Sequence, residues 1–438
     1  MSKEATRFKQ TEIGELPKEW EVVRLGELAV INPTYPLQRG REYSFIPMEA
    51  LDENFPKVKF IQKRIWKGGG SRFKCGDVLL ARITPSAENG KTAIVDFLET
   101  YEFGFGSTEF IVFSPKTEIT TSLYVYYLLK WSNVRNKLIN QMTGTTGRQR
   151  IPNDAPYYVF VPLPPLEEQR RIAGVLRLVD RVAEETKRII NIYEGAKKFA
   201  LKHLLTKGIG HTRFKQTEIG ELPEEWEVVK LGDEDVARVF AGSSAPQRQE
   251  YFENGIFPFV RVQDLARYGQ TRCLREVADK VNEKAVQEHH MVFARKGTIV
   301  FPKSGAALEK NHRAILGVDA YIVSHLAAVE ANTEKVDNEF LFWWLCRVDM
   351  ASLNPNPGYP SIRLEEIKTL PIPLPPLEEQ KQIAEMLNTI DAAIENERKY
   401  LGILEKCKRW LLDNLLTGKV RLPQEVDEIL KGVLPDAL

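Results

Sequence analysis

Three sets of residues in this chain are of types found in nucleotide-binding, methyltransferase or metal sites. Each set lacks part of what such a site requires. The first is "NGKT" (Asn89–Thr92), which resembles the end of a phosphate-binding loop. That loop requires a glycine where Pro85 stands. Proline has no backbone N–H to donate to a phosphate. We therefore expect no nucleotide site here.

The second kind resembles parts of a methyltransferase. "NPTY" (Asn32–Tyr35) and "NPNPGY" (Asn354–Tyr359) are similar to an Asn-Pro-Pro-Tyr tetrapeptide, and "EFGFGS" (Glu102–Ser107) to a glycine-rich S-adenosylmethionine loop. The second proline is out of place in both tetrapeptides. Turn-forming Asn-Pro and Gly pairs account for all three stretches.

The third kind is the set of histidines. His289 and His290 are adjacent, so on a helix or strand their side chains point apart. His203, His211, His312 and His325 have no ligand partners at metal spacing. We predict a chain that is not an enzyme and that holds no metal and no cofactor.

Composition is that of an ordinary globular protein. The chain has 438 residues, 43% hydrophobic and 28% charged, enough for two or three domains. No apolar run approaches the roughly 20 residues of a membrane span, so we expect a cytoplasmic protein with no membrane partner. Cys75, Cys273, Cys346 and Cys407 are scattered, and we expect reduced thiols.

Charge is distributed unevenly, although the net charge is only +1. Residues 39–91 hold eleven Lys/Arg against six Asp/Glu, a local basic excess. Residues 212–372 hold twenty against twenty-four. A nucleic-acid partner would therefore need a local basic face in the second region.

Internal repeats organise the whole chain. Residues 6–27 and 212–233, which we name the two arms, are identical at 19 of 22 positions. "LPPLEEQ" occurs at Leu163–Gln169 and again at Leu374–Gln380. "HLLTKG" (203–208) is answered by "NLLTGK" (414–419). The chain is therefore a tandem duplication of arm, body and helix.

The two bodies, residues 28–160 and 234–371, share layout but little sequence. Each has a strand-like run after a glycine, "GDVLLARIT" and "GTIVFPKS", followed by a basic loop and a second apolar run. Each then has an aromatic helical segment, "TSLYVYYLLKW" and "NEFLFWWLCRV". We interpret each body as an α/β domain with a curved or barrel-like sheet.

After each "PLPPLEEQ" the apolar residues change to helical spacing. The 3.5-residue period of a coiled coil joins the residues from Ile172 to Tyr193 and those from Ile383 to Leu415. Each helix would span about 40 residues, or roughly 60 Å. A helix of that length cannot bury its apolar stripe on one compact domain, so we expect the two helices to pair.

The predicted fold class is therefore α/β: two globular α/β domains separated by two long helices that pair as an antiparallel coiled coil, a tandem repeat with a pseudo-twofold axis. The expected boundaries are residues 1–160 for the first domain, 161–208 for the first long helix, 209–371 for the second domain, 372–420 for the second long helix and 421–438 for a C-terminal tail.

The repeated segments resemble those of one protein family, the specificity subunits of type I restriction–modification systems. "TEIGELPKEWEVVRLGEL" (Thr11–Leu28) and its copy resemble the opening of that family's target-recognition domains. "PLPPLEEQRRIAGVL" and "PLPPLEEQKQIAEML" resemble the starts of its spacer helices, and "LLTG" (Leu415–Gly418) a common helix ending. The resemblance covers essentially the whole chain, twice.

This resemblance implies a non-catalytic subunit that recognises double-stranded DNA. Each body would read one half of a bipartite target. The paired helices would set the spacer and dock two methyltransferase (modification) subunits, and restriction subunits would join that core. S-adenosylmethionine and ATP would belong to the partners.

Candidate DNA contacts are basic and amide side chains in polar loops, because Arg reads guanine and Asn or Gln reads adenine. In the first body we expect Arg82, Lys91, Arg148, Gln149 and Arg150. In the second body we expect Arg261, Gln263, Lys303, Ser304, Lys310, Arg313, Tyr359, Ser361 and Arg363.

Other interpretations stay open. For Trp20 and Trp226 of the arms we favour core packing over base stacking. The Glu-Glu-Gln of each "LPPLEEQ" would cap its helix or meet a partner, and we favour capping. The alternative functions are a coiled-coil scaffold with two ligand-binding domains and no DNA, and an intact DNA methyltransferase.

Overall fold

The computed structural model describes residues 8–98, 102–268, 272–354 and 360–433. The chain divides into two compact units, residues 1–188 with 399–438 and residues 189–398. Two long helices belong to both units. α3 (Leu166–Lys207) begins in the first and ends in the second, and α8 (Leu377–Leu415) does the reverse. The two predicted long helices are confirmed.

The first unit holds the first arm and body. Its strands are β1 (Phe8–Thr11), β2 (Gly14–Pro17), β3 (Glu21–Arg24), β4 (Ala29–Ile31), β5 (Glu42–Ile46), β6 (Gln62–Ile65), β7 (Ser71–Lys74), β8 (Val78–Ala81), β9 (Thr92–Ile94), β10 (Phe103–Gly106), β11 (Phe110–Pro115) and β12 (Phe160–Leu163). Its shorter helices are α1 (Ser122–Lys130), α2 (Ser132–Ile139) and α9 (Val426–Val433).

The second unit holds the second arm and body. Its strands are β13 (Phe214–Thr217), β14 (Gly220–Pro223), β15 (Glu227–Lys230), β16 (Ala237–Ala241), β17 (Phe257–Val260), β18 (Cys273–Leu274), β19 (Asp279–Val281), β20 (Phe293–Ala294), β21 (Ile299–Pro302), β22 (Ala314–Leu316), β23 (Ala320–Ile322), β24 (Leu326–Ala331) and β25 (Pro371–Leu374). Its shorter helices are α4 (Val262–Tyr268), α5 (Glu283–Glu288), α6 (Asn338–Arg347) and α7 (Leu364–Lys368).

The two bodies have the same sheet topology. The first body has one sheet in the order β6-β5-β10-β7 and one in the order β4-β11-β8-β9. The second body has β19-β17-β23-β20 and β16-β24-β21-β22, with β18 added beside β22. The pairs β5–β10 and β17–β23 are both parallel. Apart from β18, the strands of these sheets therefore correspond one to one although the two sequences have diverged.

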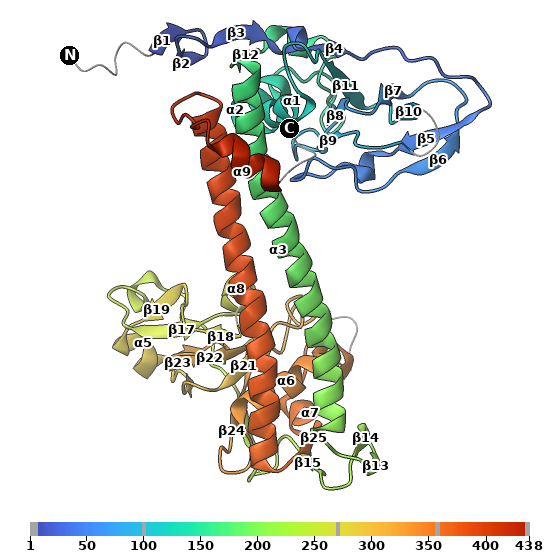
Figure 1. Ribbon diagram of the computed structural model, residues 1–438. Helices are drawn as coiled ribbons and strands as arrows, with labels where there is room; N and C mark the ends of the chain where they lie inside the picture. Colours follow the sequence, from blue (N-terminus) through green and yellow to red (C-terminus); the bar gives the residue numbers. More distant parts are fainter. Residues whose placement is uncertain (1–7, 99–101, 269–271, 355–359, 434–438) are drawn as a thin grey trace. The chain divides into compact units, whose positions relative to one another are not determined.

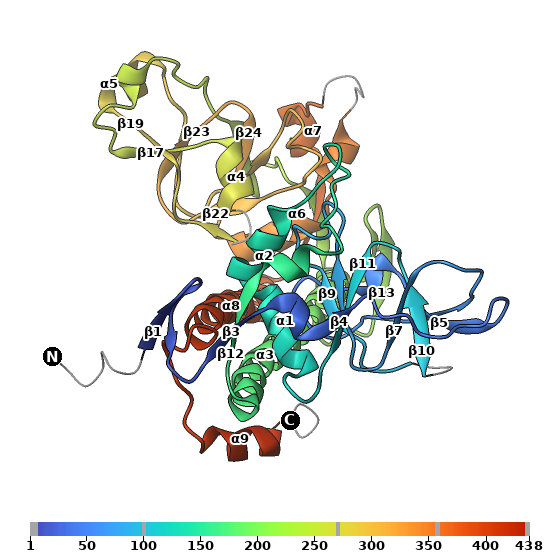
Figure 2. The ribbon, with the colours of Figure 1, turned by 90° about the horizontal axis from the view of Figure 1, so that it is seen from above.

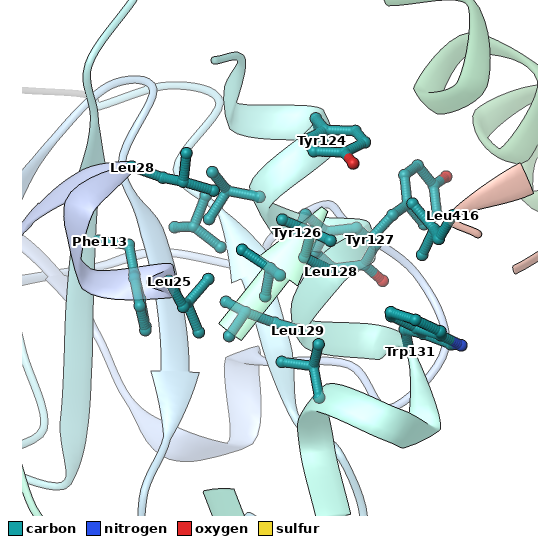
Figure 3. Close-up of a cluster of buried hydrophobic side chains, with 14 of the residues drawn as sticks. Leu25, Leu28, Phe113, Tyr124, Tyr126, Tyr127, Leu128, Leu129, Trp131 and Leu416 are labelled. Atoms are coloured by element: carbon teal, nitrogen blue, oxygen red, sulfur yellow. The ribbon is translucent and has the colours of Figure 1, made fainter. Parts of the chain in front are cut away.

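Burial explains the central strands and the aromatic helices. All four residues of β8 and of β21 are buried, as in strands covered on both faces. Thr121 caps α1 by accepting the N–H of Tyr124. The aromatic side chains of α1 lie in the core of the first unit together with Leu416, which follows α8 (Figure 3).

Each arm pairs with the strand that leads into its long helix. β3 pairs antiparallel with β12, and β15 with β25. Trp20 and Trp226 are 0% exposed, which confirms core packing for both.

The repeated Glu-Glu-Gln residues fasten the helix starts to the bodies. Gln169, which is fully buried, donates to the carbonyls of Pro164 and Ile119 and accepts the hydroxyl of Thr120. Gln380 likewise donates to the carbonyls of Pro375 and Lys335, and it accepts the backbone N–H of Asp337.

The second glutamate of each repeat accepts an indole N–H. Glu168 binds Trp20 at 2.9 Å, and Glu379 binds Trp226 at 3.0 Å. We had favoured a capping role for these residues. Instead, the carboxylates of Glu168 and Glu379 accept hydrogen bonds from groups far away along the chain, among them the backbone N–H of Ile209.

Within each unit the long helices run antiparallel (Figure 1). In the first unit the start of α3 lies against the end of α8, and Asp180 forms an ion pair with Lys408. In the second unit the end of α3 lies against the start of α8, and Lys197 pairs with Asp391 at 2.5 Å. These four residues are equivalent in the repeat, so one ion pair occurs twice.

Most of the apolar residues predicted to form a stripe along each long helix are buried where α3 and α8 pack, a surface that we call the seam. Ile172 and Leu176 in the first unit, and Ile383 and Leu387 in the second, are at most 2% exposed. Tyr193, the last residue of the predicted α3 stripe, is 37% exposed and lies outside the seam.

Helix α9, in the C-terminal tail, lies against the first turns of α3 in the first unit (Figure 2). A Cβ added at Gly174 would come within 2.7 Å of the Leu430 side chain of α9. Arg171 forms an ion pair with Asp427 at 3.0 Å. Among the described residues, no helix is long and apolar enough to cross a membrane.

A buried lysine holds the loop after β8. Lys130, the last residue of α1, donates to the carbonyl oxygens of Glu53 (2.5 Å) and Gly90 (2.7 Å). Burial lowers its pKa from 10.5 to about 7. Gly90 directly precedes Lys91, so this contact positions a candidate DNA-binding residue.

The repeated ion pair allows a matched test of helix pairing. Asp180 is 1% exposed and Asp391 is 20% exposed. We expect Asp180→Ala to lower the free energy of unfolding by about 3 kcal/mol, because Lys408 is left unpaired where water is scarce. Asp391→Ala should cost about 1 kcal/mol. Urea unfolding measures both, and equal losses would contradict this account.

The lowered pKa of Lys130 predicts a pH dependence of stability. Between pH of about 7 and about 10 the unfolded chain holds a proton on this lysine that the folded chain has lost, so stability rises with pH. The free energy of unfolding of the wild type relative to Lys130→Met should therefore increase over that range, since other titrating groups cancel in the difference. A constant difference would show that Lys130 stays charged.

Candidate nucleic-acid interface

The candidate residues of the first body meet at the end of β8. The backbone N–H of Arg82 donates to the carbonyl of Glu109 (2.9 Å), and the Arg82 carbonyl accepts from Ile151 (2.8 Å). The N–H of Thr84 donates to the carbonyl of Gln149 (3.0 Å). Arg82 therefore lies between the start of β11 and the loop that carries Arg148, Gln149 and Arg150.

Lys91 reaches the same strand end from the other side. Its carbonyl accepts the N–H of Ala81 (3.0 Å), the last residue of β8. Arg148 is exposed, while Lys91 and Gln149 are half-buried. The structure thus brings together all five candidates of this body.

The guanidinium of Arg82 faces a polar cavity of about 270 Å³. Its Nη1 donates to Oδ1 of Asn153 at 2.7 Å, and its Nε is buried with no hydrogen-bond partner among the described residues. Burial lowers the pKa of Arg82. Arg72, Thr34 and Thr108 also line the cavity. An arginine with an unused donor in a polar cavity suits a phosphate or a base edge.

Arg150 already has a carboxylate partner. Its Nε and Nη2 donate to Glu109 at 2.8–3.0 Å, and this ion pair raises the pKa of Arg150. The pair is partly exposed, with 41% of the Arg150 side chain open. DNA would compete with Glu109 for this guanidinium.

The second body repeats the backbone pattern at the end of β21. The N–H of Lys303 donates to the carbonyl of His325 (2.9 Å), and its carbonyl accepts from Ile362 (2.9 Å). Ser304 forms a β-bridge with Ser361, and its hydroxyl bonds to Nδ1 of His325 at 2.7 Å. Lys303 therefore occupies the place of Arg82.

A cavity of about 500 Å³ lies beside this strand end. Arg261, Gln263, Lys310, His312 and His325 line it. The structure thus brings three candidates together with two histidines that we had weighed only as metal ligands. Among the described residues, no cluster of side chains could hold a metal ion.

Arg261 is held in place at that cavity. Its Nε lies 2.5 Å from a carboxylate oxygen of Asp279, and its guanidinium lies over the rings of Phe252 and Phe259. An arginine stacked in this way is pre-organised for bidentate recognition.

Two of the remaining three candidates lie elsewhere. Arg313 is 7% exposed and donates to the Val348 carbonyl at 2.5 Å, and burial lowers its pKa, so its side chain packs the end of α6. Arg363 is exposed at the start of α7. Tyr359 lies outside the described residues.

Two basic residues of the first body were missed as individual candidates. Arg72 donates to the Tyr35 carbonyl at 2.7 Å, and Arg64 lies 3.9 Å over the Phe45 ring. Arg72 lines the cavity of Arg82, and Arg64 lines a neighbouring one that shares Thr108. The local basic excess of residues 39–91 was the signal that contained both.

Comparison with known proteins gives one consistent result. The family described as "Type I restriction modification DNA specificity domain" matches residues 17–193 and 223–405. The chain is 30% identical to the putative type I restriction enzyme MjaX specificity subunit of Methanocaldococcus jannaschii, covering 95% of this chain and 97% of that one. It is 28% identical to the MjaVIII specificity subunit of the same organism, covering 95% and 96%.

The fold is also shared with a solved structure. The type I restriction–modification S subunit from M. genitalium superposes with a TM-score of 0.57 at 14% identity, covering 91% of this chain and 96% of that one. The duplicated domains, the paired long helices and the two family matches agree. This chain therefore belongs to the DNA specificity subunits of type I restriction–modification systems, which are non-catalytic.

Proposed function

We propose that each body reads one half of a bipartite DNA target, and that the paired helices set the spacer and dock two methyltransferase subunits. Restriction subunits join that core. The observation that carries the proposal is that the ends of β8 and β21 have the same backbone hydrogen bonds but carry different side chains. Arg82 and Lys303 occupy the same place, as do Glu109 and His325.

The sheet frames support two different specificities on one scaffold. Base edges are read by side chains, whereas backbone contacts only position the protein. Changing Arg82 to the lysine found in the other body removes a planar fork and leaves a point charge. The same sheet frame can therefore recognise a different DNA half-site in each body.

The proposed DNA contacts are those side chains at the strand ends and neighbouring loops that the sequence singled out. In the first body they are Arg82, Lys91, Arg148, Gln149 and Arg150. In the second body they are Arg261, Gln263, Lys303, Ser304, Lys310, Ser361 and Arg363, with Tyr359. Arg313 comes last, because its guanidinium is buried against α6.

The decisive experiment is selection from a random duplex library, using the chain with its cognate methyltransferase subunit. We expect a split consensus with a fixed unspecified gap. Arg82→Ala should relax one position in one half-site by about 1–3 kcal/mol and leave the other half unchanged. Lys303→Ala is the matched variant and should affect only the other half-site.

Three other outcomes would point elsewhere. A single continuous motif would mean that one body does not read DNA. No enrichment from a complex shown to be assembled would favour the coiled-coil scaffold. Binding of S-adenosylmethionine by the isolated chain would favour an intact methyltransferase.

Helix length provides a second test. Deleting one heptad from α3 and the matching heptad from α8 shortens each by about 10 Å and keeps the seam in phase. We expect the gap between half-sites to shorten while both half-sites stay the same. Altered half-sites with an unchanged gap would contradict the role of the helices in spacing.

A further inference from the structure

A cavity of about 300 Å³ in the first unit gathers positively charged side chains. Lys130 at the end of α1, Arg135 on α2, and Lys408 and Arg409 on α8 line it. Its described lining residues are all different from those of the cavity that Arg82 faces. The proposed DNA contacts at the strand ends therefore leave this cavity unexplained.

The charged ends of Lys130 and Arg135 lie close together. A Cβ added at Gly90 would stand 2.7 Å from Nη1 of Arg135 and 3.3 Å from Nζ of Lys130. The pKa of Lys130 is lowered to about 7, first by burial and then by the positive charges of Lys408 and Arg135. An anion placed between the two cations would relieve their repulsion.

Both cations have hydrogen-bond donors to spare. The Nε of Arg135 is buried with no hydrogen-bond partner among the described residues, and the side chain forms no ion pair with a described carboxylate. An ammonium group has three donors, and Lys130 gives two of them to the carbonyls of Glu53 and Gly90. Donors without partners in a buried place cost free energy, so a ligand that accepts from them would be stabilised.

Two nearby carboxylates are already neutralised. Asp180 and Asp52 both act on the pKa of Lys130, in the direction that raises it. Asp180 forms its ion pair with Lys408, and Asp52 pairs with Lys59 at 2.9 Å. Neither carboxylate is therefore left to balance the charge of Lys130.

The carboxylates of the cavity wall do not balance that charge either. Glu53 accepts the side-chain amide of Asn89 at 3.2 Å, and Asp413 accepts the indole N–H of Trp131 at 2.8 Å. Glu405 is exposed on α8. Among the described residues, none of these three carboxylates bonds to either of the two cations.

The duplication shows that the shared frame does not require the lysine. Thr121 caps α1 and Asp337 caps α6. The ninth residue after the cap is Lys130 in the first unit and Cys346 in the second. The pair of Lys130 and Arg135 is therefore a feature of the first unit alone, which fits a ligand that binds once per chain.

We infer that this cavity binds one phosphate group between Arg135 and Lys130, with Lys408 and Arg409 as outer positive charges. Phosphate oxygens suit both the planar fork of an arginine and the remaining donor of an ammonium group. Free phosphate, a nucleotide and the DNA backbone all offer this chemistry. The inference does not rest on the proposed function, because it concerns a cavity away from the strand ends.

A phosphate in this cavity would also act on a loop of the first body. Lys130 holds the carbonyl of Gly90, which directly precedes Lys91. A bound anion favours the charged form of the lysine, which is the form that donates to this carbonyl. Phosphate binding should therefore fix the loop that carries Lys91.

The test is isothermal titration calorimetry of the full chain with inorganic phosphate at constant ionic strength. The wild type should show one saturable site. Arg135→Ala should weaken binding about tenfold or more, because the charge-assisted bonds of the guanidinium are lost. Arg135→Lys keeps the charge without the planar fork and should fall between the two.

Lys137→Ala is the matched control. It removes an exposed positive charge from the same helix, α2, at a residue that does not line the cavity. Its phosphate affinity should equal that of the wild type. Three results would each overturn the inference: no saturable binding by the wild type, equal affinity of the wild type and Arg135→Ala, or equal weakening by Lys137→Ala and Arg135→Ala.

Sulfate tests the part of Lys130, since its charge does not change near neutral pH. Between pH of about 6 and about 9 the affinity of the wild type for sulfate should fall about tenfold, because Lys130 loses its proton with a pKa of about 7. Lys130→Met should bind sulfate more weakly and without this pH dependence. The same pH dependence in both proteins would exclude Lys130 from the site and overturn the inference as stated.

Duplex DNA identifies the source of the phosphate, with the chain in complex with its cognate methyltransferase subunit. If the DNA backbone supplies it, duplex should displace free phosphate, and Arg135→Ala should weaken duplex binding about equally for all sequences and reduce the salt slope by about one. If the ligand is free phosphate or a nucleotide, phosphate should stay bound and Arg135→Ala should leave duplex affinity unchanged. Both results support the site.

The outcomes also separate this inference from the proposed function. A change of preference at one base position in Arg135→Ala would make Arg135 a base-reading residue, which would overturn the phosphate site. A wild type that binds phosphate at Arg135 but selects no split consensus would support the site and contradict the proposed function.

Discussion

The carboxylate of the second glutamate in each "LPPLEEQ" joins three parts of its unit. Glu168 accepts the Trp20 indole N–H from the arm and also the guanidinium of Arg421, which follows the end of α8. Glu379 accepts the Trp226 indole N–H and bonds to His211, which follows the end of α3. Arm, helix start and the end of the opposite helix therefore meet at one nearly buried charge. Without these donors the carboxylate would be desolvated and unpaired, so the contact imposes the arrangement.

The same contact explains two glycines. Gly208 ends the "LLTKG" segment and Gly418 is the fourth residue of the "LLTGK" segment, with φ of +63° and +65°. A Cβ at Gly208 would come within 2.8 Å of Trp226, and a Cβ at Gly418 within 2.4 Å of Pro17, beside Trp20. Each helix must turn sharply and pass close to the arm. Only glycine meets both conditions, which is why a short ending is repeated where the surrounding sequence is not.

The arms and long helices could be predicted because their sequences are repeated. The candidate DNA-contact loops are not repeated, so fewer of their contacts could be predicted. The arms, helix starts and seam were visible because each occurs twice with the same spacing. The bonds from Arg421 to Glu168 and between His211 and Glu379 were not visible, because these two residues differ in type. In the loops, Arg82 and Lys91 could be selected as residue types, but the burial of Arg313 against Val348 depends on contacts that sequence spacing does not record. Partners far apart in sequence, such as Arg150 and Glu109, decide how free a cation is.

The contacts that hold each unit together lie away from the strand ends, so the strand-end sequences of the two halves can diverge. The buried glutamates and the Asp–Lys pairs lie in the arms and long helices, whereas Arg82 and Lys303 lie at strand ends, where loops tolerate change. A substitution at a strand end changes the side chain presented there without leaving a carboxylate unpaired in the frame. Conversely, a change at Glu168 or Asp180 would disturb a unit as a whole. The duplicated chain can therefore vary the side chains at its two sets of strand ends independently while both frames stay the same.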